Sequence, residues 1–160
     1  MIDKDDFGIP EKAKACLVSI ISERMEGHKT EKETDASLIE LRELLRTLGV
    51  DSGNQYTQKR NEIEAGTILG TGRLEEIAEC ARREKAEFLV FDFELTASQV
   101  RNIKKITELE VIDRCTVILE IFAKHAQTKD AKIQIEISRL QYLLPRLTNF
   151  WSHLGRQKGG

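Results

Sequence analysis

The residues best suited to contact another molecule gather in the last part of the chain. No acidic residue follows Glu136, whereas basic, aromatic and amide side chains recur up to the end. They are Arg139, Arg146, Asn149, Trp151, His153, Arg156, Gln157 and Lys158. Cations pair with phosphates, and aromatic faces stack on unpaired bases. The pattern is therefore typical of an RNA-binding segment, although an amphipathic helix with an aromatic core face and a solvated basic face has the same composition.

A second candidate is the turn Gly70-Thr71-Gly72, which lies between a predicted strand and a predicted helix. Backbone amides at such a turn, together with the helix N-terminus, can hold a phosphate. A dinucleotide-binding loop would need a third glycine where Glu75 stands. Tight packing of the helix on the strand also explains the glycines, so phosphate binding by Gly70, Thr71 and Gly72 is the secondary hypothesis.

Acidic residues follow two of the predicted strands. Asp92 and Glu94 come after one strand and Asp113 after the next, and paired acids at such ends can exchange protons or bind Mg²⁺. Only Arg114 accompanies them, without a histidine or a nucleophile, so loop capping and ion pairing are favoured. The cysteines and histidines lack metal-ligand spacing, and no metal site is predicted in this chain.

The charge of the chain is unevenly distributed. Residues 1–113 carry 17 basic and 24 acidic side chains, whereas residues 114–160 carry 8 basic and 3 acidic ones. A nucleic-acid partner should therefore contact the C-terminal third. No apolar run approaches the roughly 18 residues of a membrane span, and three cysteines without a CxxC pair fit a reducing cytoplasm.

Strand and helix patterns alternate through the first two thirds of the chain. Strands are predicted at residues 14–21, 55–58, 67–69, 88–91 and 110–112. Helices are predicted from Thr34 or Asp35 to Gly49, over about 73–84, and from a capping box at Thr96 to about 107. This order predicts an α/β fold with a small, mostly parallel sheet flanked by helices.

From Arg114 onward the apolar spacing becomes helical. A break near residue 128 separates two helices, and a heptad-like seam on the second comprises Ile133, Ile137, Leu140, Leu144 and Leu147. Facing apolar stripes and a short polar turn predict an antiparallel helical hairpin after the sheet. Pro145 should kink the second helix or end it at about Leu144.

Four sequence blocks resemble the N-terminal domain of the HflX family of ribosome-associated GTPases. They are LGTGRLEE at 69–76; FDFELT at 91–96 with Gln99, Arg101 and Asn102; VIDR at 111–114 with ILEIFA at 118–123; and QYLLPRLT at 141–148 with His153, Leu154, Arg156 and Gln157. The resemblance implies an α/β lobe followed by a long helical arm. It also implies docking on the large ribosomal subunit to help separate the subunits.

The chain has no P-loop, because neither Gly-Lys-Ser nor Gly-Lys-Thr occurs. The resemblance implies that a GTPase domain with GTP and Mg²⁺ follows a glycine-rich linker starting near residues 157–160. We therefore expect this chain to have no cofactor of its own and not to hydrolyse GTP. Its expected partners are the large ribosomal subunit with its rRNA and the GTPase domain of the same full-length protein, but not DNA.

The expected organisation is an α/β subdomain at 1–113, a hairpin subdomain at 114–148 and a flexible start of the linker at 149–160. In the proposed interface, Arg139, Arg146, Arg156 and Lys158 contact phosphates, Trp151 and His153 stack on bases, and Asn149 and Gln157 bind base edges. Two other hypotheses remain. One is a doubly wound nucleotide-binding domain or small enzyme that uses Gly70, Gly72, Asp92 and Asp113, and the other is a regulatory lobe that restrains the GTPase domain.

Overall fold

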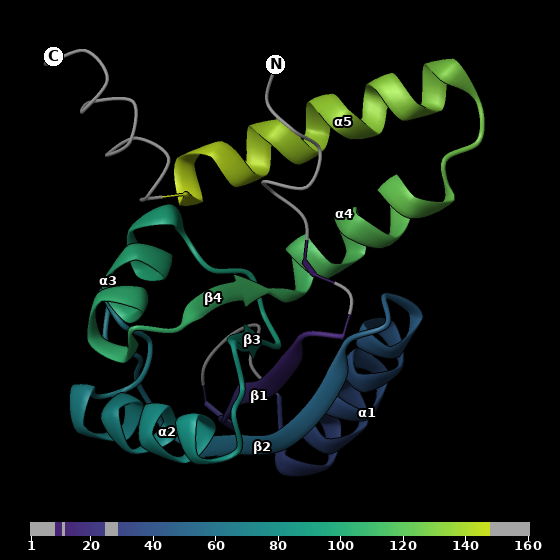
Figure 1. Ribbon diagram of the computed structural model, residues 1–160. Helices are drawn as coiled ribbons and strands as arrows, with labels where there is room; N and C mark the ends of the chain where they lie inside the picture. Colours follow the sequence, from purple (N-terminus) through teal and green to yellow (C-terminus); the bar gives the residue numbers. More distant parts are fainter. Residues whose placement is uncertain (1–8, 11, 25–28, 148–160) are drawn as a thin grey trace, which may run out of the picture.

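The lobe is built on a four-stranded sheet in which all neighbouring strands are parallel (Figure 1). The computed structural model describes residues 9–10, 12–24 and 29–147. The strands are β1 (Lys14–Ile21), β2 (Asp51–Lys59), β3 (Phe88–Phe91) and β4 (Glu110–Asp113), in the order β2-β1-β3-β4. The predicted α/β fold with a small parallel sheet is confirmed.

Helices cover both faces of the sheet (Figure 1). Helix α1 (Glu31–Thr47) packs on one face, while α2 (Thr71–Arg83) and α3 (Ala97–Thr107) pack on the other. Leu17 faces the α1 cluster, and its neighbour Val18 faces the α2–α3 cluster. Because β1 is buried on both faces, its sequence is a nearly continuous apolar run rather than an alternating one.

Helix α1 begins earlier than its sequence pattern predicted. Its N-cap is Thr30, whose side chain accepts a hydrogen bond from the backbone amide of Glu33, while the Glu33 side chain accepts one from the Thr30 amide. The predicted start at Thr34 is wrong because Thr34 is buried in the first turn, where its hydroxyl donates to the Lys29 carbonyl at 3.4 Å.

Two other helix ends match the sequence prediction. The capping box of α3 forms between Thr96 and Gln99. Gly49 follows the last turn of α1 with a φ of +77°, a left-handed conformation that glycine adopts without steric cost.

The predicted strand at 67–69 is absent. Ile68 has a φ of +66° and forms an isolated antiparallel bridge with Glu64, so this segment is a tight turn outside the sheet. Ile68 and Leu69 are nevertheless buried in the cluster beneath α2 and α3. Their apolar character therefore reflects burial of the turn and not strand pairing.

A helical hairpin extends from the lobe (Figure 1). Helix α4 (Arg114–His125) follows β4 directly, and α5 (Lys129–Leu143) returns along it. A 3-10 turn, η2 (Leu144–Arg146), contains Pro145, so the predicted end of the second helix near Leu144 is confirmed. None of these helices, nor any other in the described part, is long and apolar enough to cross a membrane.

The predicted apolar seam is only partly buried: Leu140, Leu144 and Leu147 are half-buried. Ile133 and Ile137 are 49 % and 51 % exposed, respectively. The buried positions of α5 are instead Arg139 and Leu143. Periodicity identified the helix correctly but did not predict the buried ion pair between Arg139 and Glu120 in the hairpin.

Candidate functional site

The lobe and the hairpin are joined without a linker, since β4 ends at Asp113 and α4 begins at Arg114. The Asp113 carboxylate is buried and accepts four hydrogen bonds. Its Oδ1 accepts from the amide and the hydroxyl of Thr116, both at 3.0 Å. Its Oδ2 accepts from the Leu95 amide at 2.9 Å and from the Tyr142 hydroxyl. Asp113 therefore caps α4 and also ties it to the β3–α3 loop and to α5.

Tyr142 of α5 and Arg146 of the following 3-10 turn contact Asp113 and Leu95 from the hairpin. Burial, and secondarily the hydrogen bond to Asp113, raise the pKa of Tyr142, so its hydroxyl remains a donor. The Arg146 guanidinium lies 3.6 Å from the centre of the Tyr142 ring, a cation–π contact. It also donates to the Leu95 carbonyl and to the Tyr142 carbonyl, both at 2.8 Å. The backbone of Leu95 is thus held by Asp113 at its amide and by Arg146 at its carbonyl.

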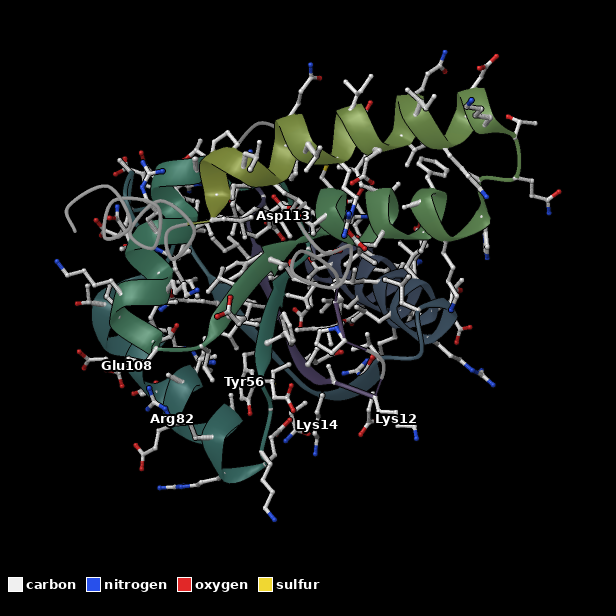
Figure 2. The ribbon with its side chains drawn as sticks, turned by 45° about the horizontal axis from the view of Figure 1, so that its top comes forward. Lys12, Lys14, Tyr56, Arg82, Glu108 and Asp113 are labelled. Atoms are coloured by element: carbon white, nitrogen blue, oxygen red, sulfur yellow. The ribbon has the colours of Figure 1, made fainter. Side chains whose placement is uncertain are left out.

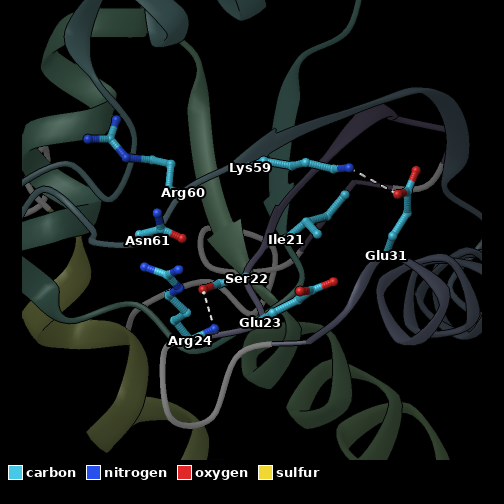
Figure 3. Close-up of a pocket in the computed structure, with 8 residues that line it drawn as sticks. All are labelled: Ile21, Ser22, Glu23, Arg24, Glu31, Lys59, Arg60 and Asn61. Carbon is cyan, nitrogen blue, oxygen red and sulfur yellow. Dashed lines mark hydrogen bonds and ion pairs between the residues drawn. The ribbon is translucent and has the colours of Figure 1, made fainter.

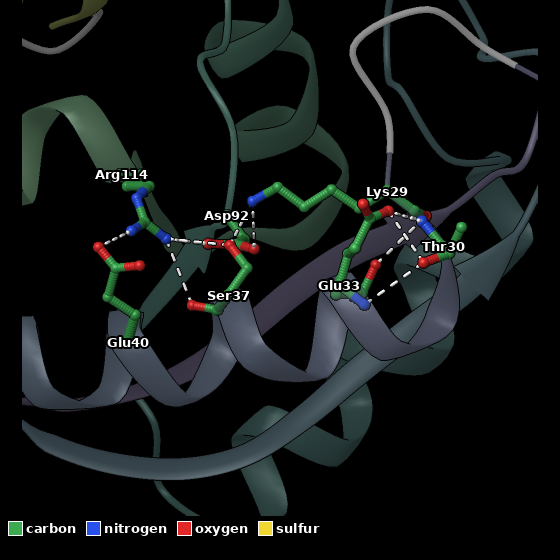
Figure 4. Close-up of polar contacts among 8 residues, drawn as sticks. Lys29, Thr30, Glu33, Ser37, Glu40, Asp92 and Arg114 are labelled. Carbon is green, nitrogen blue, oxygen red and sulfur yellow. Dashed lines mark hydrogen bonds and ion pairs between the residues drawn. The ribbon is translucent and has the colours of Figure 1, made fainter.

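Arg114 anchors the same junction to α1 (Figure 4). Its guanidinium pairs with Asp92 at 2.8 Å and with Glu40 at 2.5 Å. It also donates to the carbonyl and hydroxyl of Ser37 at 3.3 and 3.1 Å. The Lys29 ammonium lies 3.8 Å from the second oxygen of Asp92. Ion pairing and capping were favoured for the acids at these strand ends as a group, and in the structure Asp92 forms an ion pair and Asp113 caps α4.

Three of the four sequence blocks that led to the family resemblance meet at this junction. The block at 91–96 supplies Asp92 and Leu95, and the block at 111–114 supplies Asp113 and Arg114. The block at 141–148 supplies Tyr142 and Arg146. In Figure 2, Asp113 lies beneath the hairpin, on the opposite side of the lobe from Tyr56 and Lys14.

Two of the predicted RNA-binding residues have partners inside the protein. Arg139 is 5 % exposed, and its Nε lies 2.5 Å from Glu120. The charge of Arg139 is thus paired within the hairpin, and its contact with phosphate stays a prediction. Arg146 is likewise engaged with Tyr142 and Leu95. The other six, Asn149, Trp151, His153, Arg156, Gln157 and Lys158, lie outside the described residues.

The end of the hairpin carries basic side chains that the sequence prediction did not single out. Lys124 and His125 end α4, Lys129 and Lys132 begin α5, and all four are exposed. Asp130 is the one acidic residue between positions 121 and 132. The signal was present in the charge excess of residues 114–160, but only the fold shows that these lysines share the tip of the hairpin.

The turn Gly70-Thr71-Gly72 forms the N-terminus of α2. Gly70 is the N-cap, and its φ of −58° is open to any residue. No side chain caps this helix end, and a methyl group at Gly72 would meet no atom within 4 Å. Phosphate binding by Gly70, Thr71 and Gly72 stays a prediction.

A pocket of about 400 Å³ opens at the carboxyl ends of β1 and β2 (Figure 3). It is lined by Ile21, Ser22, Glu23, Arg24, Glu31, Lys59, Arg60 and Asn61. This edge is where open α/β sheets bind ligands. Two of its cations already have partners, however, because Lys59 lies 3.1 Å from Glu31 and Arg60 lies 3.0 Å from Glu64.

Comparison with solved structures supports the fold. A GTP-binding protein from the hyperthermophilic archaeon Sulfolobus solfataricus in complex with GDP matches with a TM-score of 0.59 at 24 % identity, over 91 % of this chain and 42 % of that one. A complex of SsGBP with GDP matches with a TM-score of 0.62 at 26 % identity, over 85 % of this chain and 37 % of that one.

Sequence comparison identifies the family. A family model described as the N-terminal region of GTP-binding GTPases matches residues 35–123, and one described as their middle region matches residues 125–160. GTPase HflX of Flavobacterium psychrophilum is 40 % identical over the whole chain, and GTPase HflX of Escherichia coli is 37 % identical over the whole chain. The chain spans 37 % and 35 % of these two relatives. It therefore belongs to the HflX family of GTP-binding proteins, matching the N-terminal and middle regions of its members.

Proposed function

We propose that this chain is the ribosome- and RNA-binding part of an HflX-like GTP-binding protein that acts on the large ribosomal subunit in the cytoplasm and promotes subunit separation. Its partners are the rRNA of that subunit and the GTPase domain of the same full-length protein. That domain binds GTP and Mg²⁺ and supplies hydrolysis, whereas the chain described here supplies the contact with RNA.

The basic tip of the hairpin is the observation that supports this proposal most directly. Lys124, Lys129 and Lys132 are exposed at the end of a helical arm, and the surrounding sequence is basic while residues 1–113 are acidic. A phosphate backbone is attracted to such a tip and repelled by the lobe. Any RNA contact should therefore begin at the hairpin.

The test measures binding of the chain to purified large ribosomal subunits at several salt concentrations. Reversing Lys129 and Lys132 to Glu should weaken binding and lower the slope of log K against log salt by about 1 for each lost phosphate contact. Reversing Lys32 and Lys105, two exposed lysines of the lobe, makes the same change in net charge and is the control. Equal binding by the tip variant and the control variant would contradict the proposal.

The pocket at the carboxyl ends of β1 and β2 keeps a second candidate function open, a nucleotide-binding domain. Titration of the chain with ATP and GTP, read out by chemical shifts at Asn61 and Gly72, distinguishes the two. We expect no GTP turnover by this chain, since no P-loop is present to position phosphates and Mg²⁺. Phosphate release above the buffer rate would refute that expectation.

A further inference from the structure

Strand β2 forms one edge of the sheet, and α1 and α2 lie on either side of it (Figure 1). Within the described residues it pairs with β1 alone. It is 9 residues long, whereas β4 at the other edge has 4. A long edge strand has a row of outward-facing amides and carbonyls that can pair with a strand of another molecule. The contacts along β2 therefore decide whether a further strand can bind there.

A bulge interrupts β2 in its first half. Gly53 and Asn54 together lie opposite the single residue Cys16 of β1, because the register shifts there. The Gly53 carbonyl accepts a hydrogen bond from Arg42 of α1 at 2.8 Å. The amide of the same peptide group, which belongs to Asn54, donates to Glu84 at the end of α2 at 2.9 Å. Side chains from both faces of the sheet thus occupy this peptide group, and an incoming strand cannot pair with it.

The second half of β2 directs alternate main-chain groups outward. The Arg60 amide, just after the strand, donates to the Ile21 carbonyl of β1. Main-chain groups alternate along a strand, so those of residues 56 and 58 also face β1, and those of residues 55, 57 and 59 face away from the sheet. Arg73 of α2 donates to the outward carbonyl of Thr57 at 3.2 Å. The central acceptor of this stretch is therefore already occupied.

The composition of this stretch fits pairing with a second copy of the chain. Residues 54–59, NQYTQK, contain no Pro or Gly and a single charge, which is typical of strands that pair with identical strands. In an antiparallel pair centred on Thr57, this residue exchanges two hydrogen bonds with its counterpart. Lys59 then lies opposite the neutral Gln55 and not opposite another lysine. The exchange requires a free Thr57 carbonyl, which Arg73 occupies in the single chain.

We propose that the outer edge of β2 is an interaction surface for the same edge of a second copy, and that Arg42 and Arg73 keep it closed in the single chain. Arg42 holds the bulge from α1, and Arg73 covers the Thr57 carbonyl from α2. Releasing both arginines lets two sheets join through antiparallel β2 strands. This surface lies on the lobe and does not depend on RNA binding at the hairpin tip.

Sedimentation velocity over a range of chain concentrations measures the association. The test variant carries Arg42→Ala and Arg73→Ala. The control carries Arg46→Ala and Arg83→Ala, which make the same charge change on the same two helices but remove arginines that pair with acidic residues of their own helix. We expect the test variant to dimerise with a dissociation constant at least about tenfold below that of the wild type and the control, since two carbonyls become free for pairing. Equal sedimentation of all three would overturn the proposal.

A third substitution locates the interface. Thr57→Pro removes an outward amide that β1 does not use, and edge strands tolerate proline at such positions. Added to the test variant, it should restore the sedimentation of a single chain. A dimer that persists would show that the copies associate elsewhere, which would also contradict the proposal.

Hydrogen exchange separates pairing of folded chains from association of unfolded ones. In the dimer, amides of residues 55, 57 and 59 should exchange at least about tenfold more slowly than in the wild type, while amides of β1 keep their wild-type rates. Dimerisation without this protection, or with faster exchange throughout β1, would show that the chains do not join through an intact β2 edge.

Discussion

Gly53 in the edge strand β2 lies against a carboxylate, and we expect a methyl group there to destabilise the protein. A Cβ at position 53 would stand 2.0 Å from Oε1 of Glu84, so this side chain would have to move away. Glu84 is held in place by the Cys16 thiol, which donates to it at 2.8 Å, and by the Asn54 amide, which donates to it at 2.9 Å.

The cost of Gly53→Ala can be calculated from the hydrogen bonds that the displaced carboxylate loses. A hydrogen bond to a charged group contributes about 1.5 to 3 kcal/mol when it is buried. Glu84 is half-buried, so water replaces part of each lost bond. We therefore expect Gly53→Ala to lower the free energy of unfolding by about 2 kcal/mol.

Removing the Glu84 carboxylate should reverse the sign of the stability change caused by Gly53→Ala. Gly53 does not have a positive φ, so alanine can adopt its backbone conformation. In a Glu84→Ala background, Gly53→Ala should stabilise the protein by about 0.5 to 1 kcal/mol, because alanine loses less chain entropy on folding. The coupling energy between the two positions would then be about 2.5 to 3 kcal/mol.

Urea denaturation of the wild type, the two single variants and the double variant measures this cycle. The dependence on urea concentration should be the same in all four, so that differences in midpoint report differences in stability. Additive effects, or destabilisation by Gly53→Ala when Glu84 is already absent, would refute the reasoning.

Three further predictions concern buried groups. Burial, and secondarily Glu84, raise the pKa of Cys16 from 9.0 to about 12. The protonated thiol therefore contributes fully to stability below pH 9, and this contribution is lost as the pH rises toward 12. The free energies of unfolding of the wild type and Cys16→Ala should become equal over that range. Glu120→Ala should cost about 3 kcal/mol in urea denaturation because it leaves the buried Arg139 with only the half-exposed Glu136, at 3.4 Å, as an ion-pair partner, whereas Glu120→Leu combined with Arg139→Met should remain within about 1 kcal/mol of the wild type. Leu41→Ala should cost about 3 kcal/mol in the same assay, since Leu41 is completely buried between α1 and the sheet; a loss below about 1 kcal/mol would contradict that packing.

The elements that were predicted correctly depend on short-range physics. The apolar run of β1, the capping box of α3 and the glycine after α1 each act within a few residues, so the sequence pattern contains the necessary information. The change to helical spacing at Arg114 is of the same kind. The start of α1 was misplaced because two possible caps, Thr30 and Thr34, lie one turn apart and only burial distinguishes them.

The contacts that the sequence did not predict depend on residues far apart in the chain. Arg139 lies in a basic run, and its partner in the structure is Glu120, which is 19 positions away. The apolar spacing of α5 suggested a seam through Ile137, yet the ion pair occupies the interior of the hairpin. The sequence around Arg139 does not identify Glu120 as its partner, and the sequence around Glu120 does not identify Arg139.

The sequence by itself therefore determined the α/β class, the position at which a helical arm follows the sheet, and the resemblance to the HflX family. Only the tertiary structure decided that Asp113, Tyr142 and Arg146 meet, although two of them lie 29 residues apart in the chain. It also decided that exposed lysines gather at the hairpin tip, whereas Arg146 is turned toward the lobe. The physical reason is that a local pattern records which side chains can form a helix or strand, while the partner of a charge is set by which elements pack together.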